Sequence, residues 1–410
     1  MNYISNEIKY SLGESGAEIK SAEKSVRELD SEYIAHTYAR FPINIVRGKG
    51  ALLYDECGKE YIDLGSGIAV NTFGLSDDEW VEAVTKQLKL CQHTSNLFIT
   101  DPCAKLAAKL CEISGMEKVF FSNSGAEANE CAIKAARKYA AAKNGADCFN
   151  IITLKNSFHG RTITTLAATG QDTYHSDFQP LTGGFLYAEA GDLGFIEDKL
   201  KTGTVAAVMF EVIQGEGGVI PLEPNFIMGI SQLTEKYGAL TIVDEIQTGN
   251  GRTGKYFAFM HYGIKPDIVT TAKGLGGGLP IGATLLGEKL ENVFTPGSHG
   301  STFGGNPVVC AGALNIVSRI DKKLLDKVSE MSDYIKRELT GSPGIVGVSG
   351  LGLMLGVETT KDASAVISEC HRRGVLVIKA KNKLRLLPPL NIDEKLLERA
   401  IKIIKEVCAE

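Results

Sequence analysis

The chain lacks a C-x-x-C cysteine pair, an apolar stretch long enough to cross a membrane, and a block of basic residues. Its nine cysteines are scattered, which fits a reducing compartment better than a disulfide framework or a zinc site. The formal net charge of −5 argues against a nucleic-acid partner held through phosphate contacts. Residues 1–30 lack the apolar core of a signal peptide and contain too many acids for a transit peptide. We expect a complete, cytoplasmic protein that binds neither membranes nor nucleic acid.

Motifs for two rival chemistries are also missing. The sequence has no GxxxxGK[ST] loop and no HExxH pair. The glycine-rich run 274–279 departs from GxGxxG because position 279 is leucine. Nucleotide-binding and zinc-protease interpretations therefore lose support, and we expect no metal.

What is present is the composition of a globular protein, with 23% charged and 44% hydrophobic residues. A chain of 410 residues is too long for one ordinary core, so we expect two or more lobes. Residues 1–70 are predicted to form an N-terminal segment, with a mobile or helical leader over 1–30, that packs with the smaller lobe. Residues 71–306 alternate between strand-like and helix-like segments and predict a large α/β domain with a mostly parallel sheet. Residues 307–410 predict a smaller α/β domain.

Three short apolar runs carry the clearest functional signal. The runs 205–210, 239–243 and 267–272 end at Glu211, Asp244 and Lys273. Such runs predict buried parallel strands, and ligands bind at the carboxyl ends of these strands. A lysine and an aspartate at that edge are what pyridoxal phosphate requires, since the lysine forms a Schiff base and the aspartate partners the pyridine nitrogen. Lys273 alone would be an ordinary surface lysine, but beside Asp244 that alternative loses support.

Residues 120–130 predict a site for the phosphate group of the cofactor. An apolar run ends in Ser122, small residues turn the chain, and an alanine-rich helix begins. The unpaired N–H groups at Ser124, Gly125 and Ala126 would cradle a phosphate. The alternative is a plain strand-to-helix turn in which Ser124 only caps the helix.

Four further residues have both a functional and a structural interpretation. Phe158 could stack on a pyridine ring or belong to the core, and Arg161 could bind a carboxylate or be a surface charge. Glu216 lies in a glycine-rich loop and could face a ligand or only solvent. Arg385, in an apolar run, needs an anionic partner, which could be a substrate carboxylate or a structural ion pair. The loop 299–307 also offers hydroxyl groups that could cap a phosphate.

Taken together, these segments resemble the class III aminotransferases, and most closely their acetylornithine aminotransferase branch. The resemblance covers residues 30–400 and rests on the segments 33–42, 67–71, 124–129, 158–161, 214–218, 244–247, Lys273 and 300–307. It implies the type I pyridoxal-phosphate fold and a homodimer with shared active sites. It also implies an aminotransferase of arginine biosynthesis that moves the distal amine of N²-acetylornithine to 2-oxoglutarate in a ping-pong cycle.

The resemblance assigns a role to each matching residue. Lys273 would be the Schiff-base lysine and Asp244 the pyridinium partner. Gln247 would bind the ring oxygen O3′ and Phe158 would stack on the ring. The phosphate would be held by Ser124, Gly125 and Ala126, and by Thr302 of the other subunit. Substrate contacts would come from Arg385, which binds the α-carboxylate of 2-oxoglutarate, from Glu216 as its switchable partner, and from Arg161, Asn71 and Ser301.

The sequence departs from the family pattern at two places. Val212 stands where the family usually has proline, and residues 74–78 differ from a histidine-rich stretch near the expected substrate entrance. The amino donor could therefore be ornithine, succinylornithine or 4-aminobutyrate instead of acetylornithine. The chain could also be an aminomutase or racemase on the same fold, or a cofactor-binding protein without activity.

Overall fold

The computed structural model describes residues 24–410, in two compact units divided after Asn44. Most of the leader predicted over residues 1–30 therefore lies outside the described residues. Within the first unit, helix α1 (Val26–Tyr33) begins after Ser25, whose side chain and that of Glu28 cap each other's backbone N–H groups. An ion pair of 3.3 Å joins Arg40 to Asp30 of this helix.

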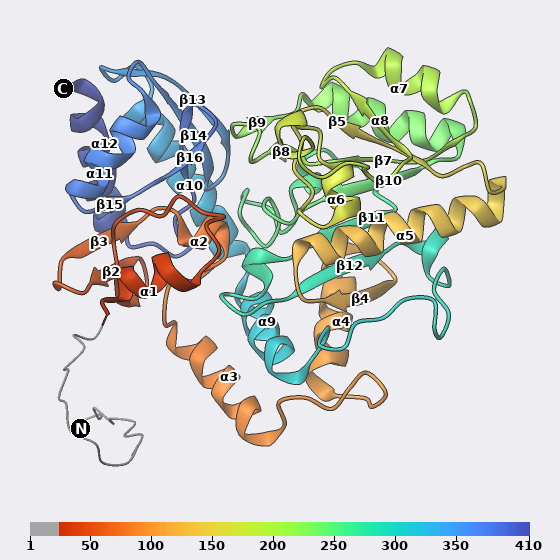
Figure 1. Cartoon of the computed structure of the whole chain (residues 1–410), viewed down its shortest axis with the longest axis horizontal. Coiled ribbons are helices and arrows are strands. Elements are labelled where there is room, and N and C mark those ends of the chain that lie inside the picture. Colours follow the sequence, from red (N-terminus) through yellow and green to blue (C-terminus); the bar gives the residue numbers. More distant parts are fainter. Residues whose placement is uncertain (1–23) are drawn as a thin grey trace, which may run out of the picture. The chain divides into compact units, whose positions relative to one another are not determined.

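The second unit contains a seven-stranded sheet with the strand order β4-β12-β11-β10-β7-β5-β6 (Figure 1). Only β12 runs antiparallel to its neighbours, and the other pairs are parallel. This confirms the mostly parallel sheet expected from the sequence. The strands are β4 (Lys118–Ser122), β5 (Asn150–Leu154), β6 (Phe185–Ala188), β7 (Val205–Phe210), β10 (Leu240–Asp244), β11 (Ile268–Thr271) and β12 (Gly282–Leu286).

Three central strands are the apolar runs that the sequence singled out. Every residue of β7, β10 and β11 is buried. β10 lies between the other two, and Asp244 at its end is in register with Thr270. Strands buried on both faces have no polar face, which explains their continuous rather than alternating apolar sequence.

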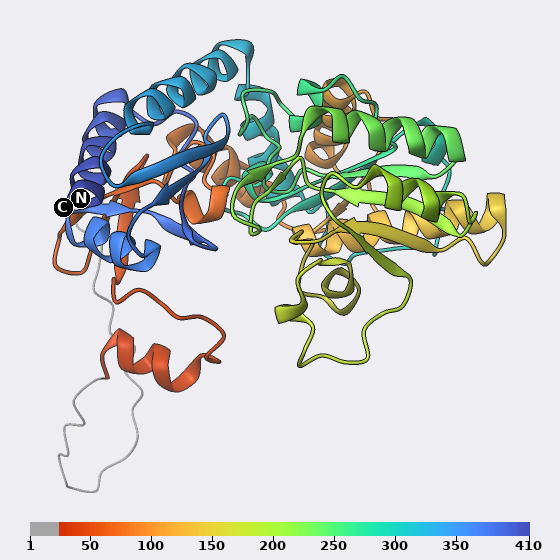
Figure 2. The ribbon, with the colours of Figure 1, turned by 90° about the horizontal axis from the view of Figure 1, so that it is seen from above.

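Helices cover both faces of this sheet (Figure 2). The long helix α5 (Gly125–Asn144) packs on one face against β4, β12 and β11, and α8 (Pro224–Tyr237) packs on β7 and β10 with α7 (Leu193–Leu200) beside it. Beyond the β4 edge, α9 (Pro307–Arg319) packs against α3 (Asp78–Leu90) and α4 (Asp101–Ser114). The sheet is thus enclosed, and ligands can approach only at its strand ends.

The C-terminal part forms a second sheet of order β13-β14-β17-β16, with its own apolar core. Its strands are β13 (Ile345–Leu351), β14 (Met354–Thr359), β16 (Ile378–Ala380) and β17 (Lys383–Leu386). The helices of this part are α10 (Lys322–Leu339), α11 (Ala363–Arg372) and α12 (Glu394–Ala409). In β17, Arg385 is in register with Gly356 of β14.

A third sheet joins residues from both ends of the unit. It has the order β1-β2-β3-β15, formed by β1 (Ile45–Lys49), β2 (Leu52–Asp55), β3 (Glu60–Asp63) and β15 (Val375–Leu376). Ile62 and Leu64 are fully buried in the C-terminal apolar cluster. This supports the packing of residues 45–64 with the smaller lobe, and the three-part division stays a prediction.

Short elements complete the second unit. They are α2 (Ser66–Ala69), α6 (Ile163–Ala168), the hairpin β8 (Ile213–Gln214) and β9 (Ile220–Pro221), and the 3₁₀ turns Asp172–Tyr174, Ala258–His261, Lys273–Leu275 and Glu288–Leu290. Over residues 24–410, no helix combines the length and the apolar character that a membrane crossing needs.

Candidate active site

A cavity of about 430 Å³ opens at the carboxyl ends of the central strands. Asp244 ends β10, and Lys273 follows β11 by two residues, so the parallel arrangement brings both side chains to one place. Eight of the residues predicted for the site line this cavity together: Ser124, Gly125, Ala126, Phe158, Arg161, Asp244, Gln247 and Lys273.

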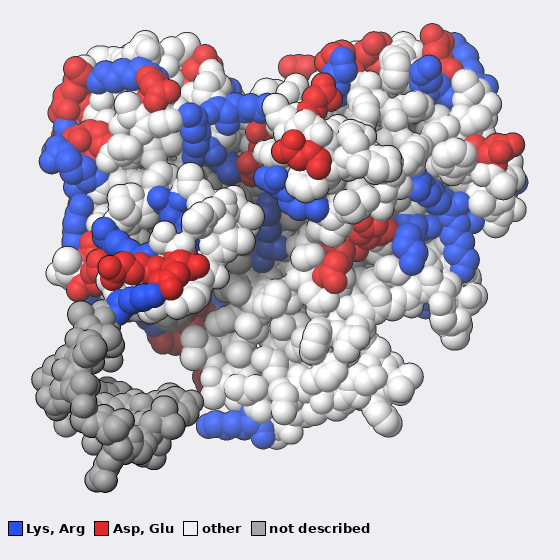
Figure 3. Space-filling model, in the orientation of Figure 1, with Lys and Arg blue, Asp and Glu red and all other residues white. Residues whose placement is uncertain are grey.

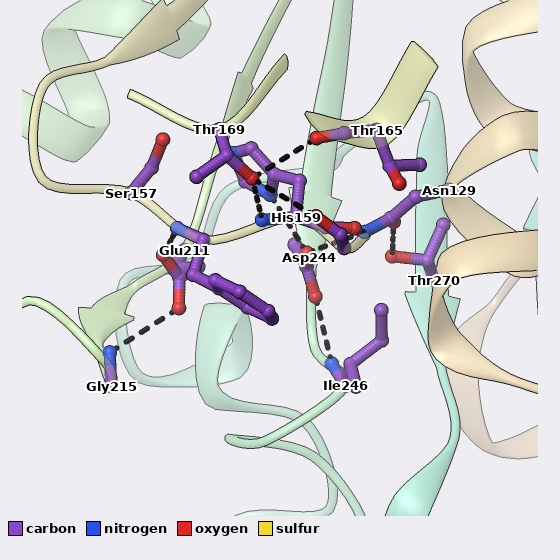
Figure 4. A network of polar contacts seen from close by, with 12 residues as sticks. Asn129, Ser157, His159, Thr165, Thr169, Glu211, Gly215, Asp244, Ile246 and Thr270 are labelled. Carbon is purple, nitrogen blue, oxygen red and sulfur yellow. Dashed lines mark hydrogen bonds and ion pairs between the residues drawn. The ribbon is translucent and has the colours of Figure 1, made fainter. Parts of the chain in front are cut away.

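Asp244 is held by three donors from different elements (Figure 4). Its Oδ2 atom accepts hydrogen bonds of 2.8 Å from Asn129 Nδ2 and from His159 Nδ1. Its Oδ1 atom accepts from the backbone N–H of Ile246 at 3.0 Å. Asn129 is itself fixed, since its Oδ1 accepts from Thr270 Oγ1 at 2.7 Å. A buried carboxylate with this support keeps its direction, as a partner of a ring nitrogen must.

His159 and Asn129 lie within the segments 158–161 and 124–129, but no role was predicted for either residue. His159 is buried, and its Nδ1 atom donates to Asp244. Its other ring nitrogen, Nε2, has no hydrogen-bond partner among the described residues. The places of these two residues in the sequence, each shortly after a strand, could have identified both. Asn129 lies in the first turns of the helix after β4, and His159 follows β5, so both stand at the edge where β10 ends.

Lys273 has an amine suited to covalent chemistry. The loss of surrounding water lowers its pKa, and the negative charge of Glu216 acts in the opposite direction. Its backbone lies in the left-handed region at φ 43°, which costs a non-glycine residue about 1 kcal/mol or more. Strain of this kind persists where the surrounding structure fixes the chain, and here the Gly274 carbonyl accepts a bond of 2.7 Å from Thr72 Oγ1.

Ser124 caps a helix and also lies at the cavity, so its role as part of a phosphate site stays a prediction. Its Oγ accepts from Glu127 N at 3.2 Å and caps α5, while the residue also lines the cavity. The next two amides, at Gly125 and Ala126, are ones that a helix leaves without intrahelical partners. The Glu127 carboxylate accepts from Asn123 N at 2.8 Å and from Asn123 Nδ2 at 3.1 Å. The first turn of α5 thus presents backbone N–H groups that fit a phosphate.

Phe158 is tied to a buried acid that borders the same cavity. The Phe158 N–H donates to Glu211 Oε2 at 2.9 Å, and Gly215 N donates to Oε1 at 3.2 Å. Burial raises the pKa of Glu211 to about 7, against the lowering effect of His159. Arg161 is exposed at the rim, with its guanidinium 4.2 Å from the Tyr174 ring centroid. The cavity therefore offers an aromatic face and a cation at its mouth.

Arg385 and Glu216 form an ion pair beside this cavity. Arg385 Nη1 donates to Glu216 Oε1 at 2.5 Å and to Gln247 Oε1 at 3.1 Å, and Gln247 lines the cavity. Arg385 is only 3% exposed, and its Nε atom has no partner among the described residues. The structure thus brings together the two residues of the predicted switch in their paired state. The ion pair alone is equally what the structural alternative expects.

Five predicted residues do not line the cavity: Arg385 and Glu216, which lie beside it, and Asn71, Ser301 and Thr302. Asn71 lies next to Gly278, which lines the cavity. A Cβ atom at position 278 would lie 3.5 Å from Asn71 Oδ1. Ser301 Oγ accepts from Asn123 Nδ2 at 3.2 Å. Thr302 is exposed and borders a separate cavity of about 190 Å³ with residues 93–100. Thr302 is therefore not brought to the phosphate cradle of its own chain.

The two departures from the family pattern lie away from the chemistry. Val212 is fully buried in the main apolar core. Asp77 caps α3 through Trp80 N and forms a two-pronged ion pair with Arg319. None of the residues 74–78 is among those that line the cavity. Among residues 24–410, no group of three or more His, Cys, Asp or Glu side chains could hold a metal ion.

Comparison with known proteins agrees with this geometry. The model of the Aminotransferase class-III family matches residues 33–408, and the chain belongs to this family. It is 46% identical to the acetylornithine aminotransferase of Haemophilus ducreyi, over 94% of this chain and 98% of that protein. Its identity to the acetylornithine aminotransferase of Methanocaldococcus jannaschii is 42%, over 93% of this chain and 98% of that one.

Solved structures give the same fold. An ornithine aminotransferase of Toxoplasma gondii, with partial occupancy of pyridoxal phosphate at its active site, superposes with a TM-score of 0.89 at 33% identity, over 95% of each chain. The N-acetylornithine aminotransferase of Stenotrophomonas maltophilia superposes with a TM-score of 0.80 at 36% identity, over 93% of this chain and 98% of that chain. The type I aminotransferase fold expected from the sequence is thereby confirmed.

Proposed function

We propose that the protein transfers the distal amine of N²-acetylornithine to 2-oxoglutarate with pyridoxal phosphate as cofactor. The observation that carries the proposal is the cavity that brings Lys273 and Asp244 together, with the Arg385–Glu216 ion pair of 2.5 Å beside it. The relatives named acetylornithine aminotransferase, at 42–46% identity, support this choice of donor.

The residues at the cavity fit each part of the cofactor. Asp244 would keep the pyridine nitrogen protonated, Phe158 would cover the ring and Gln247 would bind its ring oxygen. The first amides of α5 would hold the phosphate, and Lys273 would carry the cofactor covalently. When bound, pyridoxal phosphate supplies an electron sink for the bond that breaks at the amine-bearing carbon.

Lys273 has the second chemical task. Once the substrate amine has taken its place, Lys273 Nζ takes the proton from the amine-bearing carbon as a general base and later returns a proton as a general acid. A lowered pKa supports this, because an amine must be unprotonated to accept the proton. The surrounding burial keeps water away from the reacting atoms.

The two substrates make opposite demands on one site. The amine end of acetylornithine carries no carboxylate next to its reacting carbon, whereas 2-oxoglutarate does. With Glu216 paired, the charge of Arg385 is neutralised and the donor amine can enter. With Glu216 turned away, Arg385 is free to bind the α-carboxylate in two-pronged geometry. Arg161 and Asn71 at the rim, with Ser301 nearby, would contact the rest of the substrate.

A donor panel tests the function directly. The purified enzyme is mixed with 2-oxoglutarate and, in turn, acetylornithine, ornithine, succinylornithine and 4-aminobutyrate, and glutamate is measured. Acetylornithine is expected to give the highest kcat/KM. A higher value for another donor would move the assignment to that ω-aminotransferase. Conversion of one substrate without an oxo acid would instead identify an aminomutase or racemase.

We also propose that the active unit is a homodimer in which Thr302 reaches the partner's phosphate. The support is that Phe98, 70% exposed, and Ile99, 96% exposed, line one cavity with Thr302, while the next residue, Phe303, is 61% exposed. Figure 3 shows a broad area without charged side chains over the loop between α3 and α4. Such areas are uncommon on monomers and favour association. A fully active monomer in sedimentation would overturn this proposal.

The cytoplasm is the compartment that we propose. The support is that all nine cysteines are free thiols, as expected in a reducing environment. Fractionation of cells that express the protein, with detection in the soluble fraction, tests the compartment.

A further inference from the structure

The loop after Asp244 contains a buried cation that the proposed chemistry does not use. Arg252 is 3% exposed, and among the described residues no carboxylate pairs with it. Burial lowers its pKa to about 9, so it is protonated at neutral pH. A buried charge without a counter-ion is costly, and core packing alone would favour an apolar side chain at this position. The contacts of Arg252 therefore need an explanation.

The partners of Arg252 are backbone carbonyls at the end of the second sheet, just outside its strands. Its Nη1 atom donates to Leu353 O at 3.1 Å and to Pro388 O at 2.5 Å. In return, Leu353 N donates to Arg252 O at 2.9 Å. Gly352, at φ 53°, has no room for a side chain, because a Cβ there would lie 2.5 Å from Arg252 O. The loop and the second sheet are thus in direct backbone contact.

These carbonyls lie just beyond the ends of β17, the strand that contains Arg385, and of its neighbour β14. Leu355 of β14 pairs with Leu386 of β17, and Gly356 pairs with Arg385. Leu353 directly precedes β14 and Pro388 follows β17 by two residues, so each lies two residues beyond the Leu355–Leu386 pair. Arg252 therefore links the ends of β14 and β17, as a further pair of backbone hydrogen bonds between the two strands would.

The same loop reaches Arg385 at a second point, through the bond of 3.1 Å from Arg385 Nη1 to Gln247 Oε1. When Glu216 turns away, Arg385 keeps this bond and a weak one of 3.4 Å to Lys379 O. Two such contacts do not fix a long side chain by themselves. The backbone that carries Arg385 must then be held from elsewhere, and Arg252 holds it close to the cavity.

We propose that Arg252 is a positioning residue for dicarboxylate recognition, which sets Arg385 at the correct distance from the cavity while Glu216 moves. The inference rests on the proposed function, because it assumes that Arg385 binds the acceptor carboxylate. Arg252 touches neither substrate nor cofactor in this role. A methionine would fill the same space without bonding the two carbonyls, and a lysine would keep the charge but not the planar fork.

The test uses the holoenzyme with Arg252→Met, Arg252→Lys and the control Arg137→Lys. Arg137 also bonds two carbonyls, Phe149 O at 3.1 Å and Gly183 O at 2.8 Å, at a place remote from the cavity. The probe is glutarate, a five-carbon dicarboxylate without the oxo group, whose Kd is measured by calorimetry. The KM values for 2-oxoglutarate and for the donor are measured alongside.

Arg252→Met is expected to raise the glutarate Kd and the 2-oxoglutarate KM by about ten-fold, with the donor half-reaction changed less than about three-fold. Arg252→Lys is expected to recover part of the loss, and Arg137→Lys to change neither value. In an Arg385→Lys background, Arg252→Met should have a much smaller effect on glutarate binding, because it acts through Arg385.

Equal losses in both half-reactions, or an unchanged glutarate Kd in a folded variant, would overturn the proposal. If Arg252→Met does not fold, the same criteria are applied to Arg252→Lys, for which about a three-fold rise in Kd is expected. A wild-type enzyme that binds glutarate but makes no glutamate from acetylornithine would refute the proposed donor and not the role of Arg252.

Discussion

Asp244 and Arg385 are both 3% exposed, yet the structure treats the two charges differently. Asp244 accepts from an amide, an imidazole and a backbone N–H, so both of its oxygens are directed. Arg385 makes its two closest bonds through the single atom Nη1, and its Nε has no partner among the described residues. The side chain of its charged partner Glu216 is 25% exposed.

The difference teaches that burial does not decide how mobile a charged group is. A carboxylate with several rigid donors is fixed in place and suits a cofactor that stays bound throughout the cycle. An arginine paired with one accessible acid can exchange that acid for a substrate carboxylate at little desolvation cost. We therefore expect the proposed cofactor side of the site to be fixed and the proposed substrate side to be exchangeable.

The largest effect is expected from Lys273→Ala, which removes the covalent link on the fixed side. Turnover should fall by about 10²–10⁴-fold or more, because both attachment and proton transfer depend on this amine. Wild-type protein should be yellow, and borohydride should fix the cofactor to the peptide that contains Lys273. Lys265→Ala, at an exposed lysine remote from the cavity, is the control and should leave activity unchanged. Fixation of the cofactor on another lysine would refute the assignment.

A loss of about 10²–10³-fold in kcat is expected for Asp244→Asn, with cofactor binding largely retained. A neutral amide keeps the shape of the carboxylate but does not hold a proton on the ring nitrogen as strongly. The control is Asp267→Asn, where an acid accepts from Thr241 N at 2.9 Å away from the cavity and pairs with Lys289. Near-normal turnover of the Asp244 variant would mean that catalysis does not depend on the negative charge at this position.

The sequence predicted that the residues of the proposed cofactor side would lie together, because these residues follow directly from strand ends. Asp244, Lys273 and Phe158 each come after an apolar run, and the parallel sheet brings such ends to one edge. His159 and Asn129 were harder, since nothing in a single sequence says which nearby polar side chains will orient a carboxylate. Sequence position also does not show that Thr302 lies away from the cavity of its own chain.

The substrate side was predicted less completely for a physical reason. Its residues come from three distant segments, so the Arg385–Glu216 contact depends on how the second sheet packs against the loop after β7. The Arg252 side chain donates to two backbone carbonyls. Every residue has a backbone carbonyl, so the sequence does not show which ones an arginine will bind. The sequence could name the switch by resemblance, but it could not supply the contacts that position it.

On the exchangeable side, Arg385→Lys should raise the 2-oxoglutarate KM by about ten- to a hundred-fold, and the donor KM far less. Lysine keeps the positive charge but loses the two-pronged geometry that a carboxylate matches. Arg319→Lys is the matched control, because Arg319 forms a two-pronged pair with Asp77, at 3.0 Å for one contact, away from the cavity. An equal loss in both half-reactions would leave Arg385 with a structural role only.

The smallest effect is expected from Glu216→Gln, and it should have the opposite sign for the two substrates. The neutral amide no longer masks Arg385, so the acceptor carboxylate meets less competition, while the donor amine faces an uncompensated cation. Glutamate-like α-amino acids should become better donors by several-fold, and acetylornithine worse by a similar factor, about 1 kcal/mol in each direction. Half-reaction rates with acetylornithine, glutamate and 2-oxoglutarate measure this shift. Glu60→Gln, at a partly exposed acid paired with Arg399, is the control.

The same variant provides a pH readout that a steric effect would not give. The negative charge of Glu216 raises the pKa of Lys273 and so offsets part of the lowering caused by burial. Without that charge the ammonium form is less favoured, so the pKa of Lys273 falls further and the amine becomes unprotonated at lower pH. The rate at which the cofactor-free protein forms its yellow adduct should therefore begin to rise at a lower pH in Glu216→Gln than in the wild type. A pH profile that stays in place while donor preference changes would mean that Glu216 acts through shape alone, and the comparison between a fixed and an exchangeable charge would then lose its electrostatic basis.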